Sequence, residues 1–221
     1  MEILLIVVVS YLLGSIPTAV IISKVFFGFD IRSKGSGNMG STNAFRVLGW
    51  KAGVAVQVLD ILKGVAAVAI AVKIFNGVLP FPNATPFEDI TIVKIIAGTL
   101  AVAGHIWTAF AGFRGGKGIN TALGVLIGIT PVEVAVAAGI FMLVVFSSGY
   151  VSLGSILAAV ALPTTMVVRH NIFGVEIDGY HTLIFFSIGI ALLLIFTHRE
   201  NIRRLLEGRE NRFNKLRIFS R

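Results

Sequence analysis

The chain has 221 residues, of which 56% are hydrophobic and 14% are charged, and its mean hydropathy is +0.90. About a quarter of the residues in a soluble domain are charged, so this composition excludes an ordinary soluble protein. The absence of cysteine excludes disulfides, thiol catalysis and a zinc site with cysteine ligands. A net charge of +8 has the sign that suits nucleic acid. In a membrane protein, however, basic residues gather in the cytoplasmic loops, so we expect no nucleic-acid partner.

Apolar runs long enough to cross a membrane recur along the chain. A spanning helix needs about 20 mostly apolar residues, and these runs largely lack the polar faces of a soluble bundle. The runs cover residues 1–24, 52–75, 91–111, 132–147, 151–168 and 180–198, with a shorter one at 119–130. The first run starts at Met1-Glu2 without a basic segment, so we expect a span and not a cleaved signal peptide. The sequence predicts an all-α, polytopic integral membrane protein with a single membrane domain over residues 1–221.

The charged residues of the connecting segments alternate in sign, and this alternation orients the chain. Basic residues lie in the first and third connections and in the tail at 199–221. The acidic residues of the second and sixth connections are Glu88, Asp89, Glu176 and Asp178. The exceptions are Lys73, Lys94 and Arg169. Only a count of seven transmembrane helices places every basic connection and the tail on the cytoplasmic side, so we predict seven spans, the N-terminus outside and the C-terminus cytoplasmic.

The tail is strongly basic, and we expect a surface helix over about 199–217. Such a helix would lay its apolar residues against lipid while its arginines meet anionic headgroups. The apolar residues are Leu205, Leu206, Phe213 and Leu216.

A first polar stretch, at 35–46, is crowded with glycine, hydroxyl and amide side chains. Its Gly35-x-Gly37-x-x-Gly40 spacing matches the dinucleotide-binding fingerprint, but a membrane span precedes it where that fingerprint needs a strand. Backbone N–H groups, hydroxyls, amides and cations are what proteins use to hold phosphate. We interpret the stretch as an anion site, and the alternative is a glycine-rich connecting loop. Its polar candidates are Ser36, Asn38, Thr42, Asn43 and Arg46.

A second polar stretch, at 112–121, contains Gly115-Gly116-Lys117-Gly118. It is not a Walker A loop, because Ala111 stands where that motif needs glycine and Gly118 where it needs Ser or Thr. A glycine-rich backbone beside a lysine still suits phosphate, and a helix that starts near residue 118 would aim free N–H groups at the anion. The alternative is a basic cytoplasmic loop whose glycines permit tight packing.

Two polar groups lie inside the predicted spans. Asp60 and Lys63 are one turn apart in the second span, either as a functional pair or as a self-neutralising structural pair. His105 lies near the cytoplasmic end of the third span, either as a structural hydrogen-bond donor or as a base.

Two more polar groups lie at span ends. Ser152 and Ser155 are at the start of the sixth span, where serine normally caps a helix. The seventh span ends in His198-Arg199-Glu200-Asn201. The predicted topology puts these residues and both glycine-rich stretches on the cytoplasmic side, where they can converge on one site.

Several catalytic signatures are missing from the sequence. It has no His and Asp separated by four residues, no Gly-x-Ser-x-Gly nucleophile elbow and no paired-aspartate metal motif in a cytoplasmic loop. Its four histidines are too scattered to form a metal cage. We therefore expect no metal and no cofactor.

Together the motifs resemble those of the bacterial acyl-phosphate:glycerol-3-phosphate acyltransferases, the PlsY family, over nearly the whole chain. A Ser-Gly-Asn-x-Gly-x-Thr-Asn…Arg motif is matched at Ser36, Gly37, Asn38, Gly40, Thr42, Asn43 and Arg46. A Gly-His…Phe-Lys-Gly-Gly-Lys-Gly motif is matched at Gly104, His105, Phe113, Gly115, Gly116, Lys117 and Gly118. The family's third motif is matched by the serine-containing segment 150–155 and by the ending His198, Arg199, Asn201 and Ile202. Thr108 and Arg114 depart from the expected proline and lysine.

The resemblance implies transfer of an acyl group from acyl phosphate to the sn-1 hydroxyl of glycerol 3-phosphate. The products would be lysophosphatidic acid and inorganic phosphate, in phospholipid synthesis. The resemblance also implies a seven-span fold in the bacterial cytoplasmic (inner) membrane, with the active site facing the cytoplasm. The implied partners are the two substrates, the lipid bilayer and an enzyme that produces acyl phosphate. The intramembrane charges leave a transporter of an organic phosphate as the alternative.

The resemblance also assigns residues. Those expected to be catalytic are Ser36, Arg46, Lys117, His198 and Asn201. Those expected to bind substrate are Gly37, Asn38, Gly40, Thr42, Asn43, His105, Gly115, Gly116, Gly118, Thr121, Ser152, Ser155 and Arg199. We expect the first stretch to hold the donor phosphate and the third motif to position glycerol 3-phosphate. Acyl phosphate is already activated, so no covalent enzyme intermediate is needed; no side chain stands out as the general base, and a substrate phosphate oxygen is the hypothetical proton acceptor.

Overall fold

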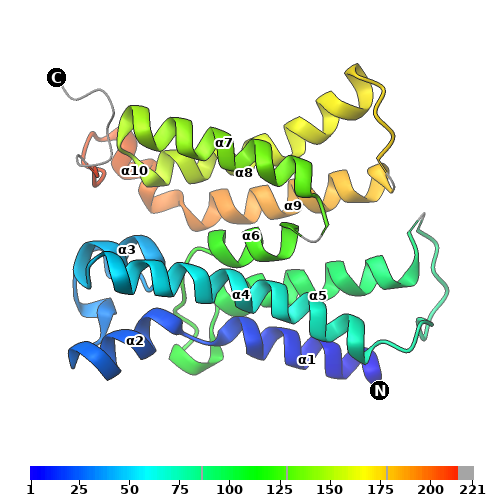
Figure 1. Ribbon diagram of the computed structural model, residues 1–221, viewed down its shortest axis with the longest axis horizontal. Helices are drawn as coiled ribbons and strands as arrows, with labels where there is room; N and C mark the ends of the chain where they lie inside the picture. The colour runs from blue at the N-terminus through cyan, green and yellow to red at the C-terminus, as the bar shows by residue number, and fades with distance from the viewer. Residues whose placement is uncertain (86, 128, 178, 214–221) are drawn as a thin grey trace. The chain divides into compact units, whose positions relative to one another are not determined.

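The computed structural model describes residues 1–85, 87–127, 129–177 and 179–213. Within these residues all regular secondary structure is helical, which confirms the predicted all-α class (Figure 1). The chain divides into two compact units, Met1–Ile129 and Thr130–Arg221. The expectation of a single membrane domain stays a prediction beside this division.

The first unit begins with two helices that meet at a bend. α1 (Glu2–Ser15) and α2 (Thr18–Phe27) are inclined by 41°. Pro17 accounts for the break, because it has no N–H to donate and disfavours the helical region for Ile16, which adopts φ −58° and ψ 114°. After α2 the chain passes through a 3₁₀ turn, η1 (Ile31–Ser33), into α3 (Ser41–Val47).

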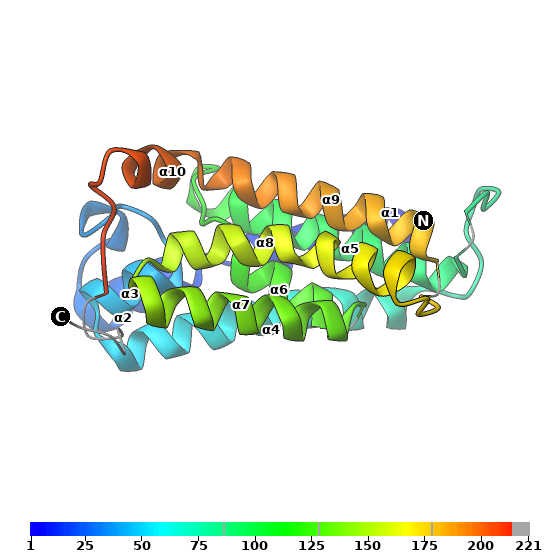
Figure 2. The same cartoon turned by 90° about the horizontal axis from the view of Figure 1, so that it is seen from above.

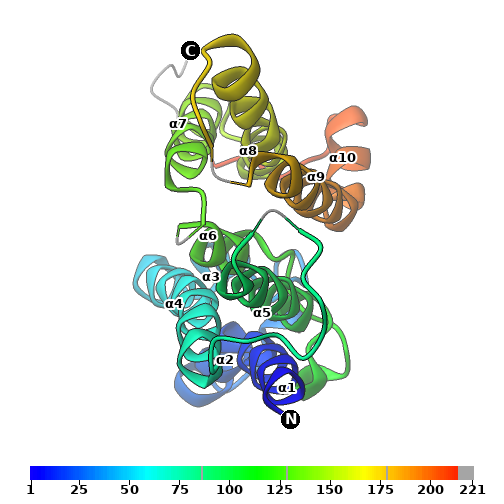
Figure 3. The same cartoon turned by 90° about the vertical axis from the view of Figure 1, so that its right-hand side faces the viewer.

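The remaining helices of the first unit pack against one another and against α1. They are α4 (Trp50–Ile74), α5 (Asp89–Ile106), a 3₁₀ turn η2 (Ala109–Ala111) and α6 (Ile119–Ile127). α1, α4 and α5 pack side by side, and α6 packs against α4 and α5 (Figure 3).

Glycines allow the closest of these helix contacts. A Cβ on Gly14 would overlap the backbone of Ala101, and a Cβ on Gly124 would overlap the carbonyl of Ile61. In lipid, helices associate through such close backbone packing and not through a hydrophobic driving force. Close helix packing therefore explains these glycines within the helices, separately from the glycines of the two glycine-rich stretches.

The described helices of the second unit are α7 (Pro131–Ser148), α8 (Val151–Val167) with its π-helical extension η3 (Val168–Ile172), α9 (Tyr180–Thr197) and α10 (Arg199–Leu206). α8 packs against both α7 and α9 (Figure 2). Gly149 has φ 78°, so the chain reverses between α7 and α8 in a short connection. Glu133 of α7 and Arg169 of η3 form an ion pair.

By length and composition, five helices among the described residues can cross a membrane, and the bent α1–α2 pair is a sixth if it forms one span. The five are Trp50–Ile74, Asp89–Ala111, Pro131–Ser148, Val151–Ile172 and Tyr180–Thr197. They and the α1–α2 pair coincide with the six longer apolar runs. α6 has nine residues and so extends about 14 Å, roughly half of the hydrocarbon core. Its length does not establish a seventh span, which stays a prediction together with the orientation of the termini.

The tail corrects one expectation. α10 ends at Leu206 and residues 207–213 are not helical, so the prediction of a surface helix to about residue 217 is wrong over these residues. Gly208 explains the end, because it has φ +68° and its N–H donates to the Leu205 carbonyl at 3.1 Å. The last part of the predicted helix, 214–217, lies outside the described residues.

Candidate active site

The connection between α2 and α3 carries the first glycine-rich stretch, and Asn43 holds it together. The Asn43 side chain is buried in the first turn of α3. Its Oδ1 accepts a hydrogen bond from the Ser36 N–H at 2.9 Å. Its Nδ2 donates to the carbonyls of Lys34 and Asn38, at 3.0 and 2.9 Å. The amide is thus engaged by the backbone of its own loop, and Asn43 fixes the shape of that loop.

The rest of this loop is arranged around the buried amide. Gly37 has φ +70°, a conformation that side chains disfavour. The Asn38 Oδ1 accepts a hydrogen bond from the N–H of Gly40 at 2.8 Å, just before α3 begins. Ser36 and Arg46 are exposed. The loop therefore combines a rigid backbone with exposed hydroxyl and guanidinium groups, which is a suitable arrangement for an anion.

Within the first unit, a hydrogen bond joins the two glycine-rich stretches, and another joins the segments just before them. Arg32 donates from Nη1 to the carbonyl of Ala111 at 2.9 Å, and Asn120 donates from Nδ2 to Ser41 Oγ at 2.9 Å. Arg32 is itself fixed by two hydrogen bonds to the Asp30 carboxylate. Those bonds outweigh the effect of burial and hold the pKa of Asp30 below its ordinary value, so the pair is ionised at neutral pH. The two stretches therefore lie side by side.

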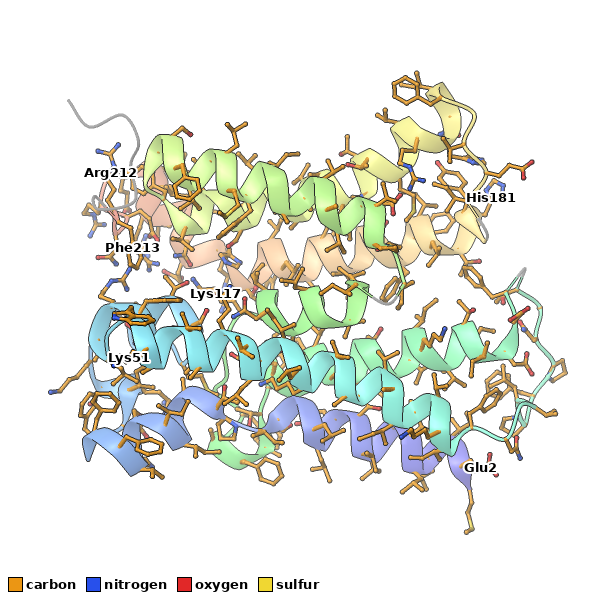
Figure 4. All side chains as sticks on the ribbon, viewed as in Figure 1. Glu2, Lys51, Lys117, His181, Arg212 and Phe213 are labelled. Atoms are coloured by element: carbon orange, nitrogen blue, oxygen red, sulfur yellow. The ribbon has the colours of Figure 1, made fainter. Side chains whose placement is uncertain are left out.

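The second glycine-rich stretch turns back onto the end of α5. The N–H groups of Gly115 and Gly116 donate to the carbonyls of Ile106 and His105, at 3.0 Å each. A Cβ on Gly115 would overlap these carbonyls, and a Cβ on Gly116 would overlap the His105 ring. Lys117 follows directly and is half-buried (Figure 4). The backbone that carries this lysine is thus fixed against His105.

α6 starts at Ile119, directly after Gly118, which agrees with the predicted start near residue 118. The Gly118 carbonyl accepts the N–H of Ala122 at 2.8 Å, and Thr121 is buried in the first turn. The positive end of the helix dipole therefore lies next to Lys117 in the sequence, and both favour an anion.

A buried polar cluster lies among the helices of the first unit. Asp60 Oδ1 lies 2.9 Å from Lys63 Nζ on the same helix and accepts a hydrogen bond from Thr18 Oγ1 at 2.7 Å. The Nδ1 of His105 lies 3.7 Å from the same oxygen. All four side chains are buried. The charges of Asp60 and Lys63 neutralise each other, as the structural alternative for this pair requires.

In the second unit, the polar residues gather around Glu210. Its Oε1 accepts hydrogen bonds from Ser152 Oγ at 2.9 Å and Asn201 Nδ2 at 2.7 Å, and its Oε2 accepts from Arg204 Nε at 2.7 Å. Burial acts to raise the pKa of Glu210, but the bonds from Asn201, Arg204 and Ser152 have the larger combined effect and lower it. Glu210 is thus an ionised link between α8 and α10.

The segment that carries Glu210 folds back onto the α7–α8 connection. The N–H of Phe213 donates to the Gly149 carbonyl at 2.9 Å, and the Arg212 guanidinium lies 4.6 Å from the centroid of the Tyr150 ring. In Figure 4, Arg212 and Phe213 lie at the end of the unit opposite His181. This attachment brings the carboxylate to Ser152 and Asn201.

Three other predicted residues of the second unit have defined positions. His198 is buried at the end of α9, and its Nδ1 lies 2.7 Å from the Leu194 carbonyl. A carbonyl only accepts hydrogen bonds, so Nδ1 carries the proton. Ser155 Oγ donates within its helix to the carbonyl of Val151 at 3.0 Å. Arg199 is exposed, with its guanidinium 4.5 Å from the ring centroid of Phe196.

Comparison with known protein families shows which family the chain belongs to. The family model described as glycerol-3-phosphate acyltransferase matches residues 4–208. The chain belongs to the glycerol-3-phosphate acyltransferase family. The glycerol-3-phosphate acyltransferase of Chlorobium phaeobacteroides (strain BS1) is 48% identical over 230 residues, with 95% of each chain covered. That of Chlorobaculum tepidum is 49% identical over 226 residues, with 96% of each chain covered.

Solved structures agree with this membership of the acyltransferase family. A crystal structure of PlsY, an integral membrane glycerol 3-phosphate acyltransferase, in its glycerol 3-phosphate form matches with a TM-score of 0.79 at 38% identity and covers 98% of both chains. The lysophosphatidic acid form matches with a TM-score of 0.78 at 37% identity, covering 98% of this chain and 97% of that one. Together with the apolar helices, this shows an integral membrane protein of that family.

Within each unit, the structure brings some of the predicted acyltransferase residues together. In the first unit, the Ser36–Arg46 loop adjoins the stretch that holds Lys117. In the second, Ser152 and Asn201 share the Glu210 carboxylate. The roles assigned to all these residues stay predictions.

Some residues of these acyltransferase loops were missed by the sequence analysis. Glu210 lies in an arginine-rich tail that was interpreted as a lipid-facing helix; Gly208, two residues before it, was the available signal that the helix ends. Arg32 is one of the basic residues of the first connection, and Asp30, two residues earlier, was the available signal of its partner. No sequence signal joined Thr18 to Asp60, because 42 residues separate them.

Proposed function

We propose that this protein transfers an acyl group from acyl phosphate to the sn-1 hydroxyl of glycerol 3-phosphate, giving lysophosphatidic acid and inorganic phosphate. Membership of the glycerol-3-phosphate acyltransferase family supports the acceptor. The PlsY structures are described in glycerol 3-phosphate and lysophosphatidic acid forms, an acceptor and its acylated product. The acyl phosphate donor rests on the motif resemblance and on the chemistry of the glycine-rich loops.

The observation that carries the donor proposal is the junction of the two glycine-rich stretches in the first unit. Ser36 and Arg46 are exposed on one stretch, and Lys117 lies on the other, two residues before the start of α6. The Asn120 side chain donates to the Ser41 hydroxyl between the stretches, and Arg32 donates to Ala111 just before them. A phosphate bound at this junction would meet two cations and a helix N-terminus. These positive groups would stabilise the phosphate anion as it leaves the acyl carbon.

The proposed reaction is a direct displacement at the acyl carbon. The sn-1 oxygen of glycerol 3-phosphate attacks the carbonyl carbon, a new ester C–O bond forms, and the bond from that carbon to the phosphate oxygen breaks. The hydroxyl proton passes to a phosphate oxygen of a substrate, so no side chain needs to act as the base. This proton path would be wrong if His198→Ala abolished turnover while both substrates still bound.

We assign the remaining residues by the same chemistry. Arg46 and Lys117 neutralise the two substrate phosphates, while His198 and Asn201 position glycerol 3-phosphate with help from Ser152 or Ser155. Asn43, Gly115, Gly116 and Gly118 shape the loops. Gly37, Asn38, Gly40, Thr42, His105, Thr121 and Arg199 are the further proposed substrate-binding residues. A single membrane domain over residues 1–221 is part of the same proposal.

We also propose the topology. α6 acts as a short seventh span, which puts the N-terminus outside and the active site on the cytoplasmic side of a bacterial inner membrane. The basic loop at 114–117 and the arginines of α10 support this orientation. The donor would come from an enzyme that makes acyl phosphate, because this activated lipid hydrolyses when it is not consumed.

The deciding experiment measures inorganic phosphate released by the purified protein from palmitoyl phosphate, with and without glycerol 3-phosphate. We expect release that depends on glycerol 3-phosphate and falls at least about 100-fold in Lys117→Ala, because a cation at the reacting phosphate is lost. Lys73→Ala, at the last turn of α4, is the matched control and should keep full activity. No release from folded, monodisperse protein would disprove the acyl phosphate donor, and palmitoyl-CoA would then test another donor.

A further inference from the structure

The buried cluster around Asp60 is larger than an ion pair needs to be. Asp60 and Lys63 already neutralise each other at 2.9 Å, yet the carboxylate also accepts the Thr18 hydroxyl, and His105 Nδ1 lies 3.7 Å away. Asp60 is 1% exposed and His105 is 3% exposed. Removing these charges from water is costly, and apolar residues of similar volume often stabilise as well. The cluster therefore calls for a reason beyond stability.

One side of the cluster fixes the break between α1 and α2. The Lys63 ammonium donates to the carbonyl of Ile16 at 3.0 Å, and the hydroxyl of Thr108 donates to the carbonyl of Ser15. Both carbonyls lie at the C-terminal end of α1, where helical partners end and the dipole favours a cation. The end of α1 is thus tied to α4 and to the segment after α5.

The other side of the cluster reaches the second glycine-rich stretch through His105. The His105 carbonyl accepts the N–H of Gly116 at 3.0 Å, and its ring lies so close to Gly116 that a Cβ there would overlap Nε2. The opposite ring nitrogen, Nδ1, faces Asp60. The imidazole therefore lies between the carboxylate, 3.7 Å from its Nδ1, and the loop backbone beside its Nε2. Lys117 is the next residue after Gly116.

We propose that Asp60 and His105 are positioning residues: the buried carboxylate orients the imidazole, and the imidazole sets the Gly115–Gly116 backbone that directs Lys117. The inference rests on the proposed function for its effect on turnover, but its geometric content does not. It gives the intramembrane charges a task in acyl transfer, in place of the substrate path that a transporter would need. It adds support of the loop backbone to the substrate-binding role proposed above for His105.

The first test separates positioning from charge neutralisation. Asp60→Asn alone leaves Lys63 buried without its counter-ion, so it can fail for a trivial reason. The double variant Asp60→Asn with Lys63→Met removes both charges together. We expect the double variant to remain folded and to lose about 10- to 100-fold in kcat/KM for palmitoyl phosphate, because displacing a catalytic group by about 1 Å has an effect of this size. A kcat/KM of the double variant within about twofold of the wild-type value would overturn the proposal.

The second test does not need turnover. The chain has no cysteine, so Lys117→Cys introduces a single thiol whose alkylation rate by a maleimide reports the loop conformation. We expect His105→Gln, and the Asp60–Lys63 double variant, to change this rate several-fold. A thiol at Ser33, which is exposed in the other loop, should react at an unchanged rate. An unchanged rate at position 117 in either variant would overturn the proposal.

The matched control is a buried carboxylate elsewhere. Glu133 is 3% exposed and pairs with Arg169, and it belongs to the second unit, whereas Asp60, His105 and Lys117 belong to the first. Glu133→Gln should lower thermal stability without altering kcat/KM or the alkylation rate at position 117. If the wild-type protein releases no phosphate at all, the proposed donor is wrong, whereas the alkylation rates still decide the role of Asp60 and His105.

Discussion

At the residue scale, the polar residues of the first glycine-rich stretch divide into those that are exposed and those that hydrogen-bond to the backbone. Asn43 has the composition of a phosphate ligand, but its amide is bound to three backbone groups of its own loop. Ser36 and Arg46, in the same stretch, are exposed. A buried amide with satisfied partners gives a loop one conformation, because breaking any of these bonds leaves an unpaired polar group. The exposed residues are thus attached to a backbone of fixed shape, as the proposed anion site requires.

Glu210 gives a prediction at this scale. Its pKa is lowered in the folded protein, so ionised Glu210 contributes stability above the ordinary glutamate pKa of about 4.3. That contribution is lost as the pH falls through the lower pKa of the folded state. We expect Glu210→Gln to lower Tm at pH 7, and the Tm difference from the wild type to shrink below about pH 4. Thermal unfolding in detergent between pH 7 and pH 3.5 measures it.

Glu207→Gln is the control for Glu210. Glu207 pairs with Arg203 and Arg209 at the surface and makes none of the contacts to Ser152 or Asn201. Surface pairs of this kind contribute little, so its Tm should stay within about 1–2 °C of the wild type. A Glu210→Gln difference that grows as the pH falls would contradict the assigned direction of the pKa.

At the element scale, glycines have two distinct tasks. Gly115 and Gly116 let a loop lie against the end of α5, whereas Gly64 and Gly124 let α4 and α6 cross closely. A Cβ on Gly64 would overlap the Thr121 carbonyl, and one on Gly124 would overlap the Ile61 carbonyl. α6 is short, so these contacts with α4 carry much of its attachment. The orientation of the loop that precedes α6 depends on them.

We therefore expect Gly124→Ala to destabilise the protein by about 1–3 kcal/mol, because one helix must move away from a backbone carbonyl. Gly139→Ala in α7 is the matched control, since a Cβ there has no neighbouring atom within 4 Å. Alanine is the better helix former, so the control should be neutral or slightly stabilising. Thermal unfolding of the two variants in the same detergent compares them. Equal Tm values would show that α6 is not held by this crossing.

At the scale of the whole molecule, the number of membrane crossings determines which loops face the same compartment. Five helices and one bent pair satisfy the length requirement among the described residues, and α6 does not. The charge pattern, on the other hand, demands an odd number of spans, because the first and third connections and the tail are all basic. A short helix that packs on α4 and α5 can cross where neighbouring protein satisfies its ends.

Single-cysteine labelling decides between six and seven spans without background, because the chain has no cysteine. Ser33→Cys and Asn211→Cys should react with an impermeant maleimide only from the cytoplasmic side, and Ala84→Cys and Glu176→Cys only from outside. These four residues are all exposed or at the surface of their loops. With six spans, position 211 would instead label from the side opposite to position 33. That result would contradict the proposed topology.

Local properties of the sequence determined the helical class, the positions of the long apolar helices and the family. Hydropathy over about 20 residues is a local sum, and motif letters at fixed spacing are also local, so both could be recognised before any fold was known. The end of α10 was missed although Gly208 marked it, because an arginine-rich tail suggested a lipid surface. The proposed roles of the motif residues came with the family and are still predictions.

Only the tertiary structure decided which polar residues meet. Asp60 meets Thr18 across 42 residues of sequence, Glu210 meets Ser152 across 58, and Asn120 meets Ser41 across 79. Each contact depends on how helices pack and where they end, and no periodicity in the chain records that information. For this reason the sequence could name the chemistry of the loops, while the packing determined that Asn43 shapes a loop and that His105 stands between a buried carboxylate and the stretch carrying Lys117.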